Sequence, residues 1–398
     1  MKNALFPIFC LSAATALVCS AENYSFDHGP YLQELTDDGV TIVFTTSGKG
    51  YSWVEIREKS AGEQAPGESY WTSKDGLKEA DNTLHAIRIP DLKPNTAYQY
   101  KLHSKEITKF APYRVTFGEE IASPWYDFKT FDPQATTCSV IAMSDVHDHT
   151  DQLKDLLKFG DYNTCDAIFY VGDMLSNSFE KNWAFKSYID ASTEMFAKNK
   201  PFIFVRGNHE TRGPVARMIP AYTPRTNGEI YGTQRIGNTF FVFLDTGEDK
   251  PNDHREYFGL VDFDTYRTRQ AKWLSKVVET PEYKQAACRI VFSHFPISEI
   301  EQYNSKLPDG QSHGMKDASD KMLKILNNAN VDLMVAGHTH RFAYHEPVPG
   351  KRNFPILVGS NKSAVRLDIE NGTIKAQAYD IENKPLLETT LGRREGSK

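Results

Sequence analysis

Cysteine is scarce in this chain, and its spacing excludes the usual cysteine-based sites. Only five cysteines occur in 398 residues and no two form a Cys-x-x-Cys pair, which argues against a zinc ribbon and against a dithiol redox motif. Cys138, Cys165 and Cys288 stand at or just before apolar runs, so we expect buried thiols. A Cys138 to Cys165 disulfide is the alternative in an exported protein, and the spacing does not decide between them.

Runs of basic residues are also absent. Acidic residues outnumber basic ones by 52 to 46, and no Lys/Arg-rich segment could follow a phosphate backbone or an anionic membrane surface. The composition therefore disfavours a dedicated nucleic-acid partner. The sequence has no internal repeat and no low-complexity tract, and its length suits two or three globular domains.

Long apolar runs are missing apart from one near the N-terminus, which is too short to span a bilayer comfortably. Lys2 precedes the apolar stretch from Leu5 to Val18, and small residues follow it up to Ala21. This order predicts a secretory signal peptide over residues 1–21, no transmembrane segment, and a secreted or periplasmic protein. Lipid attachment through Cys19 is the alternative, although Val18 makes a poor lipobox.

Residues 24–131 show the alternation of short β-strands. Apolar residues recur at every second position, as in Val40, Ile42 and Phe44, and Gly, Pro, Asn and Asp clusters separate the runs. This pattern predicts a small all-β sandwich. The phrase from Leu92 to Tyr100 resembles the tyrosine corner of fibronectin type III domains, in which a Tyr hydroxyl ties a strand to the preceding loop.

The period changes after a short linker at residues 132–134, and residues 137–392 form the second predicted domain. Apolar strands now alternate with helical stretches, which is typical of an α/β layered domain. We expect strands at 139–143, 167–171, 202–205, 240–244, 289–292 and 333–335, helices at 179–198, 270–278 and 315–328, and further β-structure at 356–391.

Polar clusters of metal-ligand type follow five of these strands. They are Asp145-Val146-His147, Gly172-Asp173, Gly207-Asn208-His209-Glu210, His294, and Gly337-His338-Thr339-His340. Any one of them could be a helix cap, a turn or a satisfied core histidine. Their coincidence at successive strand ends predicts a single site at one sheet edge, where α/β folds bind ligands. We expect Gly207 to permit a sharp turn that projects the next two side chains.

This order of motifs, D-x-H, GD, GNH(E), H and GHxH, resembles the calcineurin-like metallophosphoesterase superfamily over about residues 137–379. With the preceding fibronectin-like sandwich, it looks most like the purple acid phosphatase branch. The resemblance implies a helix-flanked double β-sheet sandwich with two metal ions at one edge. It implies that Asp173 bridges the two metals, and that the other ligands divide into one set of Asp145, His147 and His340 and another of Asn208, His294 and His338.

The same resemblance implies hydrolysis of phosphate monoesters by attack of a metal-bound hydroxide, with His209 as general acid. The cofactors would be two divalent ions, Zn, Fe or Mn, because carboxylate, imidazole and amide ligands suit them. The partner would be a small phosphorylated substrate. Two alternatives stay open: a phosphodiesterase of the same superfamily, and a non-catalytic binding protein that keeps the fold.

The sequence departs from the purple acid phosphatase pattern at two positions. His147 stands where the branch has Gly, and Ser176 stands where it has a Tyr ligand to ferric iron. Without the tyrosine phenolate, trivalent iron would have no matching anionic ligand. We therefore expect two divalent metal ions and no purple chromophore.

Substrate-side residues are expected just past the strand ends. Arg212 could hold a phosphate oxygen, and the irregular stretch from Thr246 to Gln270, with His254 and Tyr257, is expected to border the active-site cleft. For Glu210 we expect a supporting contact behind the ligands or a helix cap.

Overall fold

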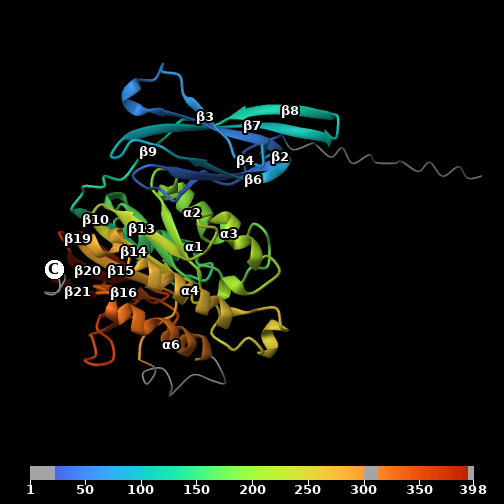
Figure 1. Ribbon diagram of the computed structural model, residues 1–398. Helices are drawn as coiled ribbons and strands as arrows, with labels where there is room; N and C mark the ends of the chain where they lie inside the picture. Colours follow the sequence, from blue (N-terminus) through green and yellow to red (C-terminus); the bar gives the residue numbers. More distant parts are fainter. Residues whose placement is uncertain (1–22, 300–311, 393–398) are drawn as a thin grey trace, which may run out of the picture.

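The computed structural model describes residues 23–299 and 312–392 (Figure 1). The predicted signal peptide, including Cys19, lies outside these residues. Within the described ranges, no helix is both long and apolar enough to cross a membrane.

The first part of the chain is all β, as predicted. Its strands are β1 (Tyr31–Gln33), β2 (Val40–Glu58), β3 (Glu68–Tyr70), β4 (Ser73–Lys74), β5 (Leu77–Lys78), β6 (Asn82–Ile89), β7 (Ala97–Ala111), β8 (Arg114–Ala122) and β9 (Tyr126–Lys129). The long strand β2 is shared: its first half pairs with β6 and its second half with β7, with an irregularity between Thr45 and Gly50. The predicted corner is present, because the Tyr98 hydroxyl accepts the backbone N–H of Lys93 at 2.9 Å.

The second part holds two six-stranded sheets. Sheet order is β12-β11-β10-β19-β20-β21 in one and β13-β14-β15-β16-β18-β17 in the other. The strands are β10 (Thr137–Met143), β11 (Ala167–Val171), β12 (Phe202–Val205), β13 (Gly232–Ile236), β14 (Thr239–Leu244), β15 (Cys288–Ser293), β16 (Leu333–Ala336), β17 (Ala343–His345), β18 (Ile356–Val358), β19 (Ser363–Glu370), β20 (Thr373–Asp380) and β21 (Pro385–Leu391). Strands β10, β11 and β12 run parallel in the first sheet, and β14, β15, β16 and β18 run parallel in the second. Among them β11 and β16 are buried along their length, which explains their unbroken apolar sequences.

The two sheets pack face to face around a shared core, in which the rings of Phe169 and Phe292 stack at 4.0 Å. Helices cover the outer faces (Figure 1). They are α1 (Thr150–Phe159), α2 (Asp190–Ser192) and α3 (Ile219–Tyr222) beside the first sheet, and α4 (Phe263–Val277), α5 (Pro281–Gln285) and α6 (His313–Asn328) beside the second. This arrangement confirms the predicted fold class, a helix-flanked double sheet preceded by an all-β region.

Two local predictions are wrong. The single helix expected at 179–198 is a shorter, uneven helix, in which π-helical turns Phe185–Ile189 and Thr193–Ala197 flank α2. The stretch expected to be irregular up to Gln270 already contains the first turns of α4 from Phe263. The expectation of buried thiols is confirmed, because Cys138, Cys165 and Cys288 are free and buried, which leaves out the disulfide alternative.

Contacts tie the all-β region to the double sheet. The Tyr31 hydroxyl donates to the carbonyl oxygen of Tyr222 at 2.7 Å, and the Tyr100 hydroxyl donates to that of Lys198 at 2.9 Å. Both tyrosines are fully buried, so the all-β region covers part of the helical layer of the first sheet.

Candidate metal centre

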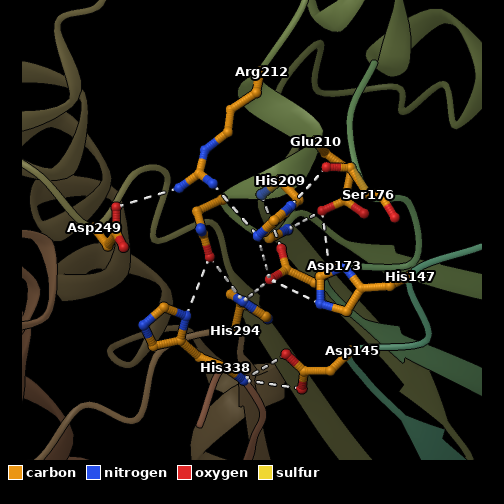
Figure 2. Close-up of polar contacts among 12 residues, drawn as sticks. Asp145, His147, Asp173, Ser176, His209, Glu210, Arg212, Asp249, His294 and His338 are labelled. Carbon is orange, nitrogen blue, oxygen red and sulfur yellow. Dashed lines mark hydrogen bonds and ion pairs between the residues drawn. The ribbon is translucent and has the colours of Figure 1, made fainter. Parts of the chain in front are cut away.

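The predicted polar clusters meet at one edge of the double sheet because parallel strands end there. Asp145 follows β10, Asp173 follows β11 and His209 follows β12 in the first sheet. His294 follows β15 and His338 follows β16 in the second. Figure 2 shows these side chains pointing toward one another from the two sheets.

One group of four potential ligands lies on the outer side. One atom each from Asp145, His147, Asp173 and His340 falls within 4.8 Å of the others. The Nε2 atoms of His147 and His340 are 3.2 Å apart, and His340 Nε2 is 3.3 Å from Asp145 Oδ1. Two imidazoles and two carboxylates aimed at one point are a donor set that transition metals accept.

A second group lies deeper and shares Asp173. His294, His338 and Asp173 form the next cluster of ligand atoms. The amide oxygen of Asn208 is 3.1 Å from His294 Nε2 and 3.2 Å from His338 Nδ1. The Nδ1 atom of His294 contacts the carbonyl oxygen of Val171 at 2.8 Å, which leaves Nε2 as the nitrogen that faces the cluster.

The electrostatics of the two groups are dominated by burial and by Asp173. Burial opposes ionisation of Asp173, but His294 at 3.1 Å holds the pKa of this carboxyl well below its usual range. Burial likewise opposes protonation of His294, yet the charge of Asp173 outweighs it and raises the His294 pKa to about 10. Burial lowers the pKa of His338 to about 3.

The backbone at both groups is unusual. Five of the candidate ligands have left-handed backbone conformations, which non-glycine residues rarely adopt. Their φ angles are 59° at Asp145, 47° at His147, 54° at Asp173, 70° at His338 and 56° at His340. Such conformations persist only where the surrounding structure imposes them, and they concentrate at functional sites.

Gly207 is needed for a different reason from the sharp turn that we predicted. It is not among the positive-φ residues. A Cβ atom on it would lie 2.2 Å from Asp173 Oδ1 and 2.4 Å from the Asp173 backbone nitrogen. The glycine therefore allows the strand end after β12 to approach the one after β11.

Glu210 supports the loops from behind, in line with the first of its two predicted roles. Its fully buried carboxylate accepts backbone N–H groups from Gly207 (2.7 Å), Asp173 (3.0 Å), Met174 (2.7 Å) and Leu175 (3.2 Å). Burial and the neighbouring charge of Asp173 raise the pKa of Glu210 to about 7. This side chain fixes the two strand ends that carry Asn208 and Asp173.

His209 lies on the open side of the two groups. Its Nδ1 atom contacts the carbonyl oxygen of Ser176 at 2.6 Å, and its backbone N–H donates to Asp173 Oδ1 at 2.9 Å. Its Nε2 atom is 3.9 Å from Asp173 Oδ2 and 3.4 Å from Nη1 of Arg212. The Nε2 edge of the His209 ring is therefore turned toward the two groups of potential metal ligands.

The three predicted substrate residues occupy different surroundings. Arg212 reaches His209 and forms an ion pair with Glu248 at 2.9 Å. Tyr257 is buried and its hydroxyl donates to Glu248, whereas His254 accepts the backbone N–H of Glu256 at 3.3 Å and begins a short helical turn. The substrate roles of these three residues stay predictions.

Sequence reasoning missed two acidic residues at this edge. Asp148 accepts the backbone N–H of Ser176 (3.0 Å), the indole N–H of Trp183 (3.0 Å) and the Ser187 hydroxyl (2.5 Å), and so fixes the loop that follows Asp173. Its place directly after the Asp-Val-His motif was the available signal. Glu248 lies in the stretch from Thr246 that we expect to border the cleft, but its short charged run gave no signal for a buried supporting role.

Comparisons with known proteins agree with this geometry. The calcineurin-like phosphoesterase family model matches residues 138–342, which is more than half of the chain. A UDP-2,3-diacylglucosamine hydrolase of Coxiella burnetii (strain Dugway 5J108-111) is 23% identical over 224 residues, which cover 54% of this chain and 86% of that protein. Purple acid phosphatase 21 of Arabidopsis thaliana is 22% identical over 288 residues, which cover 68% of this chain and 55% of the plant protein.

The solved structure of purple acid phosphatase PPD1 from yellow lupin (Lupinus luteus) seeds superposes with a TM-score of 0.67 at 14% identity. The superposition covers 92% of this chain and 74% of the lupin chain, so it includes the all-β region as well as the double sheet. The overall fold is therefore that of a purple acid phosphatase. By its family match and by the placing of its Asp and His clusters, the chain belongs to the calcineurin-like phosphoesterase family.

Proposed function

We propose that this protein is an exported phosphatase that hydrolyses phosphate monoesters with two divalent metal ions. The observation that carries the proposal is the sharing of Asp173 by two separate clusters of potential ligands. A carboxylate between two such clusters can serve two cations at once, which is the arrangement used for in-line displacement at phosphorus. Export follows from the signal peptide predicted over residues 1–21, with attachment through Cys19 as the alternative.

The donor set fits the expected cofactors. Two carboxylates, four imidazoles and one amide oxygen suit Zn, Fe or Mn, and the absence of a thiolate or phenolate disfavours a trivalent ion. We assign Asp173 to both metals, and divide the other ligands into Asp145, His147 and His340 on one side and Asn208, His294 and His338 on the other. When bound, the cations would supply a nucleophile from water at neutral pH and neutralise charge on the phosphate.

His209 is proposed as the general acid. The Ser176 carbonyl oxygen holds Nδ1 at 2.6 Å, so that Nε2 faces the substrate side. A proton on Nε2 can pass to the oxygen of the leaving alcohol. Arg212 is proposed to bind a phosphate oxygen, and His254 and Tyr257 to border the cleft.

The decisive experiment is hydrolysis by metal-free protein to which Zn, Fe or Mn is restored, one at a time. We expect release of phosphate from an aryl monoester to exceed hydrolysis of a bis-aryl diester. Asn208→Ala and His209→Ala should each lower kcat/KM by about 100-fold or more, since single catalytic groups contribute on that order. His103→Ala is the matched control, because this histidine lies in the all-β region, away from the metal centre, and is hydrogen-bonded to Glu55.

The alternatives give different results in the same assay. A faster rate on the diester would identify a phosphodiesterase. Tight metal and phosphate binding without hydrolysis of either ester would identify a binding protein. Unchanged activity in His209→Ala would refute the assigned acid.

A further inference from the structure

A buried acidic cluster lies beside the metal centre and supplies none of its ligands. Glu248 follows β14, which is not one of the strands that end in predicted ligands, and its side chain is fully buried. It accepts hydrogen bonds from Thr211 Oγ1 (2.5 Å), Arg212 Nε (2.9 Å), Arg212 Nη2 (3.2 Å) and the Tyr257 hydroxyl. Both carboxylate oxygens thus receive two donors.

The cluster keeps Glu248 charged. Burial opposes its ionisation, but the hydrogen bonds and charge of Arg212 lower the pKa of this carboxyl below its usual value. Burial in turn opposes the charge on Arg212, and Glu248 and Asp249 raise the Arg212 pKa above its usual value. Glu248 has no remaining acceptor capacity and carries the same sign as a phosphate ester, so it is not suited to touch substrate itself.

The position of Arg212 is set by this pairing. Its Nε and Nη2 edge is held by the two oxygens of Glu248, in the bidentate geometry that guanidinium and carboxylate groups favour. Nη1 is left to face the centre, 3.4 Å from His209 Nε2 (Figure 2). Without such a partner, a long flexible arginine would sample many rotamers.

The backbone of Glu248 is itself fixed. The fully buried Arg267 of α4 donates from Nη1 to the carbonyl oxygens of Thr246 (2.9 Å) and Glu248 (3.2 Å). At the start of α6, Gly314 lies so close that a Cβ atom on it would be 2.0 Å from the Glu248 carbonyl oxygen. Helices α4 and α6, which lie outside the second sheet, therefore fix the backbone of the loop whose Glu248 side chain binds Arg212.

We propose that Glu248 is a positioning residue, which orients Arg212 so that Nη1 binds an oxygen of the substrate phosphate. Tyr257 acts one step further back, by holding Glu248. This inference rests on the proposed function only in taking a phosphate group as the ligand.

The test is binding of inorganic phosphate to the zinc-reconstituted protein, measured by calorimetry, together with the KM and kcat of the monoester. Glu248→Gln preserves volume but turns one acceptor oxygen into a donor, so two of its four partners lose their bond. We expect about tenfold weaker phosphate binding and a KM raised by a similar factor, with a smaller change in kcat, as for loss of a charged hydrogen bond. Arg212→Gln should give at least the same loss.

The double variant decides between positioning and a general structural effect. Because Glu248 acts through Arg212, adding Glu248→Gln to Arg212→Gln should weaken phosphate binding no further. A full additional tenfold loss in the double variant, or unchanged binding in Glu248→Gln alone, would overturn the proposal. Asp368→Asn is the control, since it breaks an Arg366 ion pair on β19 beside the opposite end of β10.

A milder variant covers the case in which Glu248→Gln does not fold. Tyr257→Phe removes one hydroxyl donor and leaves the ion pair, and we expect about threefold weaker phosphate binding that disappears in the Arg212→Gln background. Unchanged binding in a folded Tyr257→Phe protein would remove Tyr257 from the proposal. Since phosphate binding needs no turnover, an inactive protein would refute the proposed hydrolysis and leave this coupling measurable.

Discussion

Replacing Gly207 with alanine tests whether the metal centre depends on the close approach of two strand ends. The added Cβ would lie 2.2 Å from Asp173 Oδ1, 2.4 Å from the Asp173 backbone nitrogen and 2.9 Å from Glu210 Oε2. A backbone nitrogen cannot move away without moving the shared carboxylate. We expect a loss of about 3 kcal/mol in the free energy of unfolding, at the upper end for overpacking.

The same displacement should weaken metal binding at both positions, because Asp173 belongs to both clusters. Loss of correct support behind a ligand typically costs about 10- to 100-fold in metal affinity. Thermal unfolding of the metal-free protein would measure the first effect, and competition with a chelator would measure the second for each ion.

Gly48→Ala is the matched control. In β2, a Cβ atom on Gly48 would meet nothing closer than 3.4 Å, which is ordinary contact. Because alanine restricts the unfolded chain, we expect this change to be neutral or to stabilise by up to about 0.5 kcal/mol. If Gly207→Ala matches Gly48→Ala in stability and in metal affinity, close approach does not determine the site.

Three further predictions concern the metals, the thiols and acid stability. The metal-loaded protein should lack a strong visible charge-transfer band, because Ser176 replaces the expected phenolate and contributes only backbone contacts; an intense purple solution would contradict this. The three buried thiols Cys138, Cys165 and Cys288 should react with a thiol reagent only after unfolding, and a reductant should leave Tm unchanged. Burial lowers the pKa of His85 to about 4 in the folded protein, so its neutral form contributes stability that is complete above pH 6.5 and is lost as pH falls toward 4. The pKa shift of His85 corresponds to about 3 kcal/mol in the free energy of unfolding. The variant His85→Phe can keep the ring contact with Phe44 and should flatten the decline in stability between pH 6.5 and pH 4. An unchanged pH profile of stability would refute the assignment.

The fold and the location of the site were predictable because they follow from local patterns. Strands such as Ala167–Val171 and Leu333–Ala336 are continuous apolar runs, which is what a parallel strand covered on both faces requires. Each run stops at a polar cluster, and parallel strands bring such clusters to one edge. No knowledge of tertiary contacts was needed for this step.

The supporting residues were not predictable because their roles depend on distant segments. Glu248 stands in the run Gly247-Glu248-Asp249-Lys250, whose sequence is that of an exposed loop. It is buried because Arg267 from α4 and Gly314 from α6 close over it. The helix at 185–197 likewise packs against residues of the all-β region, such as Tyr31 and Val43, and its own sequence does not indicate those contacts.

The backbone conformation of the candidate ligands could not be predicted from their neighbours in the sequence. Aspartate and histidine enter the left-handed region more often than most non-glycine residues, and Asp145, His147, Asp173, His338 and His340 all adopt it. Nothing in their sequence predicts this, and the conformation is imposed by contacts such as the Asp145 N–H to the Gly172 carbonyl oxygen (2.9 Å) and the His338 N–H to Asp145 Oδ2 (3.0 Å). The conformation is not confined to the site, because eleven other non-glycine residues of the described chain, among them Glu34, Asp161 and Phe258, adopt it as well. Asn208 and His294, in turn, are candidate ligands without it, so the backbone conformation supports the site only together with the order of the motifs.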